Sequence, residues 1–358
     1  MTRRTGLDAR TGLALLYIAL VPVLLGGCSA QGSAAAPAGP AEELRLGYFD
    51  NVTHAPALVG LEKGLLADSL GGTKLRSQVF SAGPAAIEAL SAGAIDAAYL
   101  GPNPAVNSFV QSAGQSVRIV AGAASGGAAL VVRPGITGPD DLAGTTIATP
   151  QLGNTQDVAL RAWLASEGYE TSTTGGGDVS IAPTDNIQTL TLFRSGKIDG
   201  AWLPEPWVSR LVLEAGATVL VDEASLWPGG AFPTTVLVVR ADYLAAHPDT
   251  VQALVAGHAA SVDWLTRHPD QAAAVINHKL TADTGKPLPD AVLARALTAV
   301  SFTTDPLAAT FPVLQQAGVD VGTAKPGNLS GLFALAPLNR VLTDAGAPPV
   351  SAAELGTE

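Results

Sequence analysis

Small polar residues recur in this sequence where a predicted strand ends and a predicted helix begins. The clearest case is ATPQLGNTQDVALRAWLASEG (148–168), which predicts a strand, a turn that contains Gly153, and a helix. The first N–H groups of a helix lack intrahelical partners, and they can bind an anion. The turn carries no lysine of the kind that a nucleotide-binding loop places on phosphates. Its residue types therefore favour a small anion held by hydroxyl, amide and backbone N–H groups.

Gln151, Asn154 and Thr155 are the candidate ligand-binding residues of this turn. Asn154 is the predicted N-cap of the helix, and Asp157 follows like the acidic member of a capping box, so capping without ligand binding is the alternative. Gly153 allows a ligand to approach the backbone closely. A small monoanion with several acceptor oxygens can be held by neutral donors with a lower desolvation cost than by lysine or arginine.

Similar turns follow other predicted strands. In FDNVTHAP (49–56), the polar residues either cap the next helix or bind the ligand, and His54 either faces a cleft or lies on the surface. The turns SAGP (81–84), GPNP (101–104) and ASGGA (124–128) each offer further polar side chains or glycines. The candidate ligand-binding residues from these turns are Asn51, Thr53, His54, Ser81, Gly83, Asn103, Ser125 and Gly127.

The turn PEPW (204–207) adds an acid and an aromatic residue. Glu205 is a candidate partner for an ammonium group on the solute, and a solvated turn carboxylate is the alternative. Trp207 and Trp227 are candidate walls for an alkyl or aromatic tail, and core packing is the alternative for both.

The elements that must position these turns follow a regular order. From Leu44 onward, short apolar runs alternate with helical patterns, which predicts an α/β protein with parallel or mixed sheets. SAGAIDAAYLGPNP (91–104) also matches RSGKIDGAWLPEPW (194–207) position by position. Chance similarity is one explanation, and two lobes built on the same plan is the other. Ligands of open α/β sheets bind at the carboxyl ends of the strands, which is where these turns lie.

Two apolar runs are the predicted crossover strands between the lobes. They are AALVVR (128–133) and TTVLVVR (234–240). The chain then passes from the first lobe into the second and back, an arrangement that favours hinge closure on a ligand. The predicted boundaries are 42–133 and 236–358 for lobe 1, and 134–235 for lobe 2.

The N-terminal residues predict export and anchoring. Residues 1–28 combine basic Arg3, Arg4 and Arg10 with a short apolar run, which is typical of a signal peptide, a signal anchor being the alternative. The run ends in LLGGC, which resembles the lipobox of bacterial lipoproteins and makes Cys28 the predicted lipidation site. Residues 29–41 are rich in small residues and predict a flexible tether. We therefore expect a lipid-anchored protein on the extracytoplasmic face of the cell membrane.

Composition excludes several other functions. The chain has 358 residues and a formal net charge of −11, so it lacks the excess of positive charge that is typical of nucleic-acid-binding proteins. The five histidines lie at no metal-ligand spacing, no G-x-S-x-G elbow occurs, and Cys28 is the only cysteine. We therefore expect no cofactor, no metal and no enzymatic activity.

Taken together, four stretches resemble the substrate-binding proteins of ABC importers in the aliphatic sulfonate, taurine and nitrate group. They are LGYFDNVTHAPALVGLEKG, FSAGPAAIEALSAGAIDAAYLGPNPA, ATPQLGNTQDVALRAWL and IDGAWLPEPW, and the resemblance extends from Leu44 to about Asp320. It implies a two-lobed type II periplasmic-binding-protein fold, in which each lobe is a mixed sheet flanked by helices. It also implies a monomer that delivers a small-molecule anion to an ABC permease with its ATPase. An aliphatic sulfonate such as taurine is the expected solute, and Glu205 is the candidate partner for the ammonium group of an aminosulfonate. Nitrate, bicarbonate, a sulfate ester and a thiamine precursor stay open as solutes. An enzyme related to thiamine-precursor synthesis on the same fold stays open as the alternative function.

Overall fold

The structure is a computed structural model that describes residues 39–358. The predicted signal peptide, Cys28 and most of the predicted tether lie outside the described residues. Among the helices of 39–358, none combines the length and the apolar character needed to cross a bilayer.

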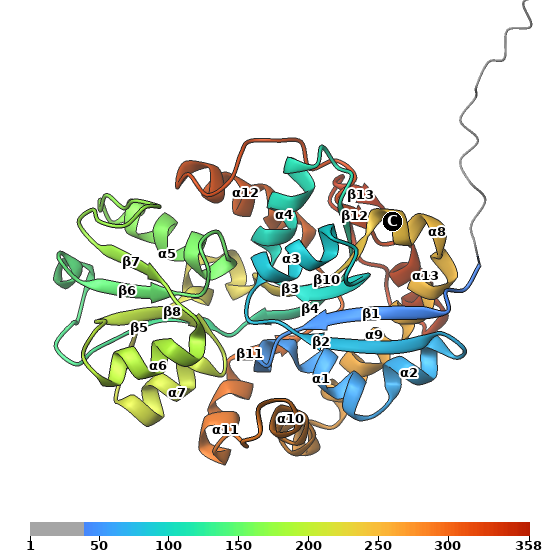
Figure 1. Cartoon of the computed structure of the whole chain (residues 1–358), viewed down its shortest axis with the longest axis horizontal. Helices are drawn as coiled ribbons and strands as arrows, with labels where there is room; N and C mark the ends of the chain where they lie inside the picture. The colour runs from blue at the N-terminus through green and yellow to red at the C-terminus, as the bar shows by residue number, and fades with distance from the viewer. Residues whose placement is uncertain (1–38) are drawn as a thin grey trace, which may run out of the picture. The chain divides into compact units, whose positions relative to one another are not determined.

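The first sheet has eight strands and mixed directions (Figure 1). Its strand order is β13-β12-β4-β10-β3-β1-β2, and β11 also pairs with β4. β1 runs parallel to β2 and β3, whereas β10 runs antiparallel to β3 and β4. The bounds are β1 (Glu43–Tyr48), β2 (Lys74–Val79), β3 (Ala97–Leu100), β4 (Val117–Gly126), β10 (Pro233–Arg240), β11 (Val300–Phe302), β12 (Phe333–Ala334) and β13 (Gly356–Thr357).

The second sheet has five strands in the order β7-β6-β8-β5-β9. β6 runs parallel to β7 and β8, and β5 runs antiparallel to β8 and β9. The bounds are β5 (Ala128–Val132), β6 (Thr146–Thr149), β7 (Ser180–Pro183), β8 (Gly200–Pro204) and β9 (Thr218–Asp222). We refer to each sheet with its helices as a lobe.

Helices cover both faces of both sheets. Figure 1 shows α3 and α4 on one face of the first sheet and α1, α2, α9 and α10 on the other. In the second lobe, α5 packs on one face, and α6 and α7 pack on the opposite face. The helix bounds are η1 (Val52–His54), α1 (Ala55–Glu62), α2 (Leu65–Leu70), α3 (Gly83–Ser91), α4 (Pro102–Gln111), η2 (Pro139–Leu142), α5 (Thr155–Ser166), α6 (Asn186–Arg194), α7 (Trp207–Ala215), η3 (Glu223–Leu226), η4 (Pro228–Gly230), α8 (Ala241–Ala246), α9 (Pro248–Arg267), α10 (Pro269–Thr284), α11 (Asp290–Thr298), η5 (Ala308–Thr310), α12 (Phe311–Asp320) and α13 (Ala336–Asp344).

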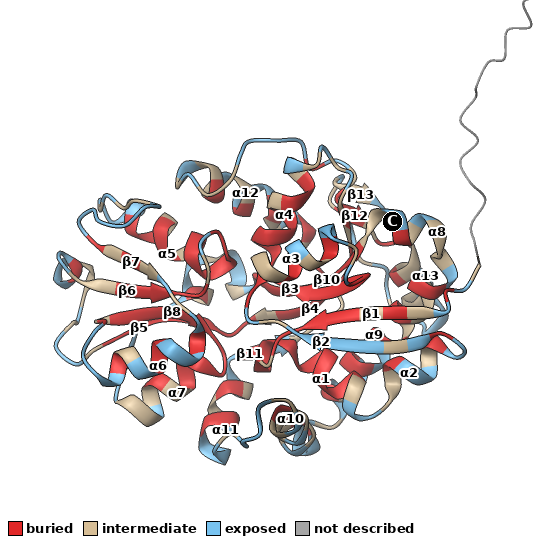
Figure 2. Cartoon of the chain, viewed as in Figure 1, coloured by how far each residue is buried: buried red, intermediate tan, exposed pale blue. Residues whose placement is uncertain are grey.

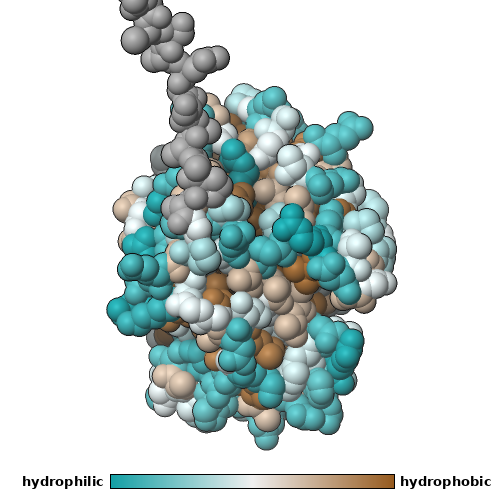
Figure 3. Space-filling model, turned by 90° about the vertical axis from the view of Figure 1, so that its right-hand side faces the viewer, coloured by the Kyte–Doolittle hydropathy of each residue, from teal (hydrophilic) through white to brown (hydrophobic). Residues whose placement is uncertain are grey.

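The side chains of the second sheet alternate between two cores. In β8, Ala201 and Leu203 pack against α6 and α7, whereas Trp202 packs on the opposite side with Trp163 of α5. This alternation is the two-residue period of a strand, and burial on both faces explains why these strands are apolar throughout. The central strands are accordingly buried, while most flanking helices present one buried and one exposed side (Figure 2). On the face of the molecule shown in Figure 3, hydrophilic residues surround small groups of hydrophobic ones.

One predicted boundary needs correction. Residues 128–132 form β5, which pairs with β8 and β9 of the second sheet, so they do not belong to lobe 1 as expected. The chain passes between the sheets at Gly126 and Gly127, whose φ angles of 77° and 74° are accessible to glycine at no steric cost. The return strand β10 pairs with β3 and β4 in the first sheet.

Candidate functional site

A small cavity lies at the carboxyl ends of strands from both sheets. Its volume is about 20 Å³, which leaves room for little more than one water molecule. The lining residues follow or end β1, β2 and β3 in the first lobe and β6, β7 and β8 in the second, and β10 adds two threonines. They are Phe49, Asn51, Thr53, His54, Ser81, Gly101, Pro150, Asn154, Gln156, Asn186, Pro204, Thr234 and Thr235. A solute larger than water therefore enters only when the lobes part.

Four helices begin at this cavity. Gly101 is the N-cap of α4, Asn154 is the N-cap of α5, Asn186 is the first residue of α6, and Ser81 lies two residues before α3. The N-terminus of a helix carries a partial positive charge and backbone N–H groups without intrahelical partners. Their convergence from both lobes makes the cavity favourable to a negative charge.

The cavity itself has no formal charge at neutral pH. Among its lining residues, only His54 titrates in the physiological range, and complete burial lowers its pKa to about 3. The neutral ring of His54 packs on Phe49 at a centroid distance of 4.4 Å, and its Nδ1 accepts a hydrogen bond of 3.3 Å from the backbone N–H of Phe49. Attraction to an anion therefore rests on helix termini and neutral donors, without a lysine or an arginine in the lining.

Two polar atoms at the cavity are buried without a hydrogen-bond partner. They are Oδ1 of Asn186 and Oγ1 of Thr235, whose residues are 8% and 1% exposed. Buried polar groups in folded proteins are nearly always hydrogen-bonded, so each of these two atoms is expected to form a hydrogen bond when the site is occupied. The threonine hydroxyl can donate, and a rotation of the asparagine amide presents its NH₂ group in place of the oxygen. Both residues can thus supply donors to an anion.

Five of the residues predicted from the sequence line the cavity. They are Asn51, Thr53, His54, Ser81 and Asn154. The capping alternative holds for Asn154 at the same time, because its Oδ1 accepts a hydrogen bond of 3.0 Å from the Thr155 N–H.

Asp157 does not complete the expected capping box. Its carboxylate accepts hydrogen bonds from Gly153 N–H at 2.9 Å, Thr149 Oγ1 at 2.9 Å and Arg161 Nε at 3.0 Å. Asp157 and Arg161 form a buried ion pair within α5. The bonds from Thr149 and Gly153 to the Asp157 carboxylate link the end of β6 and the following turn to this helix.

Trp207 joins the two lobes. Its Nε1–H donates a hydrogen bond of 2.9 Å to Oδ1 of Asn51, which lines the cavity. The ring is 8% exposed and packs in the core between α7 and the second sheet. Trp207 thus contacts a cavity residue and does not itself line the cavity.

The expectation for Glu205 is wrong. Its carboxylate accepts hydrogen bonds from Ser209 N–H and Oγ and pairs with Arg295 of α11 at 3.1 Å. Burial raises the pKa of Glu205, and the bonds from Ser209 and Arg295 act against that rise. Glu205 is 1% exposed and does not line the cavity, so it is not available to an ammonium group there.

The other predicted residues lie near the cavity without lining it. Gln151 borders a neighbouring hollow of about 40 Å³ that Ser81 and Asn186 also line. Gly83 lies against Pro104, since a Cβ built there would be 2.4 Å from Cγ of that proline. Gly127 lies near Thr53, since a Cβ atom added to Gly127 would be 3.4 Å from Cγ2 of that threonine.

Ser125, Asn103 and Thr155 have other contacts. The Ser125 hydroxyl accepts a hydrogen bond of 3.3 Å from Phe232 N–H, and the Asn103 amide donates one of 3.1 Å to the Leu314 carbonyl. Oγ1 of Thr155 lies against Gly101, since a Cβ atom added to Gly101 would be only 2.3 Å from this oxygen. This last contact brings the start of α5 in the second lobe against the start of α4 in the first.

Sequence reasoning missed several lining residues. Asn186 follows β7 in a strand-to-helix turn like the others, so the same signal was present in SIAPTDN (180–186). Thr234 and Thr235 are the polar residues at the start of the apolar strand β10, and a search for turns that follow a strand does not select them. The remaining missed residues are Phe49, Gly101, Pro150, Gln156 and Pro204.

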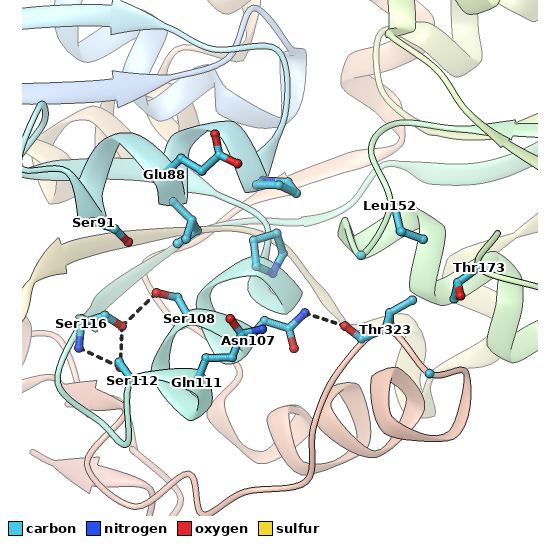
Figure 4. A pocket seen from close by; sticks show the side chains of 15 residues that line it. Glu88, Ser91, Asn107, Ser108, Gln111, Ser112, Ser116, Leu152, Thr173 and Thr323 are labelled. Atoms are coloured by element: carbon cyan, nitrogen blue, oxygen red, sulfur yellow. Dashed lines mark hydrogen bonds between the residues drawn. The ribbon is translucent and has the colours of Figure 1, made fainter.

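A larger groove of about 570 Å³ runs along α3 and α4 (Figure 4). Three of its four serine hydroxyls bond to one another, with Ser108 and Ser112 both donating to Ser116 Oγ at 2.9 and 3.0 Å. Asn107 donates to the Thr323 carbonyl at 3.3 Å. Because these polar groups satisfy each other, and because Glu88 is the acid in the lining, this groove is less suited to an anion than the small cavity.

A family model described as the NMT1-like family matches residues 37–279. The chain belongs to the NMT1-like family. Over 198 residues, or 55% of this chain and 59% of the relative, it is 30% identical to the taurine-binding periplasmic protein of Escherichia coli (strain K12). Over 265 residues, or 72% of this chain and 76% of the relative, it is 26% identical to a putative aliphatic sulfonates-binding protein of Bacillus subtilis (strain 168).

Solved structures confirm the predicted fold. The alkanesulfonate-binding protein SsuA from Xanthomonas axonopodis pv. citri matches with a TM-score of 0.66 and 23% identity, over 82% of this chain and 96% of that one. The periplasmic nitrate-binding protein NrtA from Synechocystis PCC 6803 matches with a TM-score of 0.68 and 16% identity, over 80% of this chain and 83% of that one. This NMT1-like protein therefore has the periplasmic-binding-protein fold, with two mixed sheets flanked by helices.

Proposed function

We propose that this NMT1-like protein is the extracytoplasmic solute-binding component of an ABC importer and that it captures an organic sulfonate between its lobes. The observation that carries the proposal is the uncharged polar cavity on which four helix N-termini converge. Relatives whose names specify taurine and aliphatic sulfonates support the sulfonate over other anions.

The chemistry of the lining suits a monoanion with several oxygens. A sulfonate spreads one charge over three oxygens, so hydroxyl, amide and helix N–H donors satisfy it without a cation. A phosphate dianion instead favours charge-assisted bonds from arginine or lysine. Hydrogen bonds to charged groups stabilise a complex by about 1.5–3 kcal/mol each, so a few such donors account for tight binding.

Nitrate or bicarbonate is the second candidate, and one observation favours it. The cavity measures about 20 Å³, which suits an inorganic monoanion better than an alkanesulfonate when the lobes are closed. The structural likeness to a nitrate-binding protein agrees with this alternative.

A thermal-shift and calorimetry panel separates the candidates. The panel contains taurine, 1-butanesulfonate, nitrate, bicarbonate and the neutral sugar glucose. At a hundredfold excess over Kd, a ligand that binds only the folded state stabilises it by about 2.7 kcal/mol. We expect stabilisation by the sulfonates and a loss of binding in Thr235→Val, whereas Thr191→Val on the exposed side of α6 is the matched control. Stabilisation by glucose alone, or by no member of the panel, would refute an anion site.

The same panel tests the expectation that the protein is not an enzyme. Mass spectrometry of each solute after incubation with the protein should return the unchanged compound. A chemically altered solute would support the enzymatic alternative.

We also propose that the mature protein is a monomer that is anchored through a lipid on Cys28 and delivers its solute to a permease with its ATPase. The basic, apolar and LLGGC segments of residues 1–28 support this anchoring. Firm attachment requires more than one acyl chain. Cys28→Ser should therefore move the protein out of the membrane fraction or leave it as a longer, unprocessed precursor. A variant of mature length that stays in the membrane fraction would contradict lipidation.

A further inference from the structure

The segment that returns the chain from the second sheet to the first forms one wall of an apolar groove. This crossover segment (223–232) lies between the end of β9 and the start of β10, and it contains η3 and η4. Together with α5 of the second lobe and with α12, which contacts both α5 and the first-lobe helix α4, it encloses about 710 Å³. The volume is in the range of small-molecule sites. We call this space the hinge groove, because both lobes and the chain that joins them form its walls.

The hinge groove is separate from the polar cavity. Asn154 lines the cavity, whereas the next residue, Thr155, lines the groove, so the contact between the first turns of α4 and α5 divides the two spaces. The groove has its own opening to solvent, since Leu226 and Val313 in its walls are 46% and 59% exposed. A ligand can therefore occupy the groove while the division stays closed and the anion fills the cavity.

The unpaired polar atom of Asn103, which lines the groove, is a hydrogen-bond acceptor. Nδ2 of Asn103 donates to the Leu314 carbonyl at 3.1 Å, and this bond fixes the amide, because a flip would place its oxygen against the carbonyl oxygen. Oδ1 is buried without a partner, in a residue that is only 3% exposed. Buried acceptors are nearly always hydrogen-bonded, so Oδ1 favours a ligand with an N–H or O–H group.

The charge of the groove disfavours an anion. Among its lining residues only Glu223 is ionisable, and its carboxylate accepts a hydrogen bond of 2.8 Å from Trp202 Nε1. An acid and an unpaired acceptor repel a negative group, so the groove differs in chemistry from the anion cavity. Trp163 of α5 and Trp227 of the crossover segment add aromatic surface, on which another aromatic ring packs favourably.

We propose that the hinge groove binds an uncharged aromatic molecule with an N–H or O–H donor, and that this second ligand favours closure of the lobes. Its ring contacts α5, α12 and the crossover segment, and its donor bonds to Oδ1 of Asn103. Because the walls belong to both lobes, the ligand loses contacts when the lobes part, so it shifts the equilibrium toward the closed arrangement. Coupling between two sites is reciprocal, so this ligand and the anion raise each other's affinity by the same factor. The groove site is independent of the proposed function, and only its coupling to the anion rests on that function.

Calorimetry with 1-naphthol and 1-methoxynaphthalene tests the site. Both probes are uncharged at pH 7, and only 1-naphthol has a donor, so it should bind about 2- to 12-fold more tightly, the effect of one hydrogen bond. Asn103→Leu should remove this preference, a ratio that does not depend on the stability of the variant. Ala162→Phe fills the groove and should weaken 1-naphthol at least tenfold. Ala165→Phe, on the exposed face of the same helix, is the matched control and should bind 1-naphthol like the wild type.

The coupling is measured with both ligands. Saturating 1-naphthol should raise the affinity for 1-butanesulfonate at least fivefold, the lower end of typical coupling between sites, and Ala162→Phe should abolish this increase. Small-angle scattering should show a smaller radius of gyration with 1-naphthol alone.

The outcomes separate the groove from the proposed function. If 1-naphthol does not bind, or binds Ala162→Phe as tightly as the wild type, the groove site is overturned. Equal affinity for the two probes overturns the role of the donor. Competition between 1-naphthol and 1-butanesulfonate would place both in one space and overturn the proposal, and binding of both without coupling overturns the effect on closure. If no anion binds while 1-naphthol still binds and reduces the radius of gyration, the proposed function fails and the groove assignment stands.

Discussion

Replacing Gly101 by alanine is expected to prevent closure of the lobes while each lobe stays folded. The backbone of Gly101 has φ −70° and ψ 154°, which alanine adopts without strain. A Cβ at this position would lie 2.3 Å from Oγ1 and 3.3 Å from Cβ of Thr155 in the other lobe. The first distance is far inside the roughly 3.5–4.0 Å at which nonbonded carbon atoms attract. The clash therefore opposes the closed state specifically.

The expected loss of affinity follows from this contact. Overpacking by one methyl group costs about 1–3 kcal/mol in a site that cannot relax, and Thr155 is 2% exposed. If the cost applies only to the closed state, Gly101→Ala should weaken 1-butanesulfonate by about 5- to 150-fold. Calorimetry measures the affinity, and small-angle scattering should show a smaller decrease in the radius of gyration on addition of the solute.

Two controls make this test specific. Gly72→Ala introduces the same methyl group where no atom lies within 4 Å of the built Cβ, and it should bind normally. Thr155→Ala removes Oγ1, so the double variant with Gly101→Ala should bind nearly as well as Thr155→Ala alone. Wild-type affinity in Gly101→Ala would refute the idea that the contact between α4 and α5 belongs to the bound state.

Three further substitutions test separate features. Burial raises the pKa of Glu223 from 4.5 to about 7, so ionisation of this carboxyl destabilises the fold as the pH rises through that window. The free energy of unfolding of Glu223→Gln relative to wild type should therefore be about 2.5 kcal/mol higher at pH 8 than at pH 5 in urea unfolding, and a pH-independent difference would count against this reasoning. Trp207→Phe removes the bond to Asn51 between the lobes and should lower solute affinity in calorimetry about fivefold, whereas unchanged affinity would show that the bond is dispensable for closure. Asp157→Asn leaves Arg161 buried without its counter-ion and should lower the free energy of unfolding by about 3–5 kcal/mol, and a loss below 1 kcal/mol would contradict the burial of that pair.

The sequence predicts best those site residues whose position depends on local structure. Asn51, Ser81 and Asn154 each follow a strand and precede a helix, and the carboxyl ends of parallel strands meet at one edge of a sheet. Their convergence on one cavity therefore follows from the order of strands and helices alone.

Residues whose roles depend on distant partners were beyond such reasoning. Glu205 pairs with Arg295, which lies 90 positions later in the chain, and no local sequence pattern predicts this ion pair. Thr235 reaches the cavity because β10 is inserted between β3 and β4, a pairing that requires the order of the sheet. For the same reason the run AALVVR was assigned to the first lobe, since its apolar character fits either sheet equally well.

The order of strands also governs how early each lobe can form as the chain is made. Within the described residues, the second sheet uses only the continuous segment 128–222, so its contacts are complete once that segment has emerged. In the first sheet, by contrast, β4 pairs with β10, β11 and β12, all of which lie beyond residue 232. Pairing between segments so distant in sequence is slow, and unpaired strand edges expose a nascent chain to aggregation. The second lobe can therefore complete its strand pairing before the first lobe, and β4 has no β10, β11 or β12 to pair with until the chain beyond residue 232 is available.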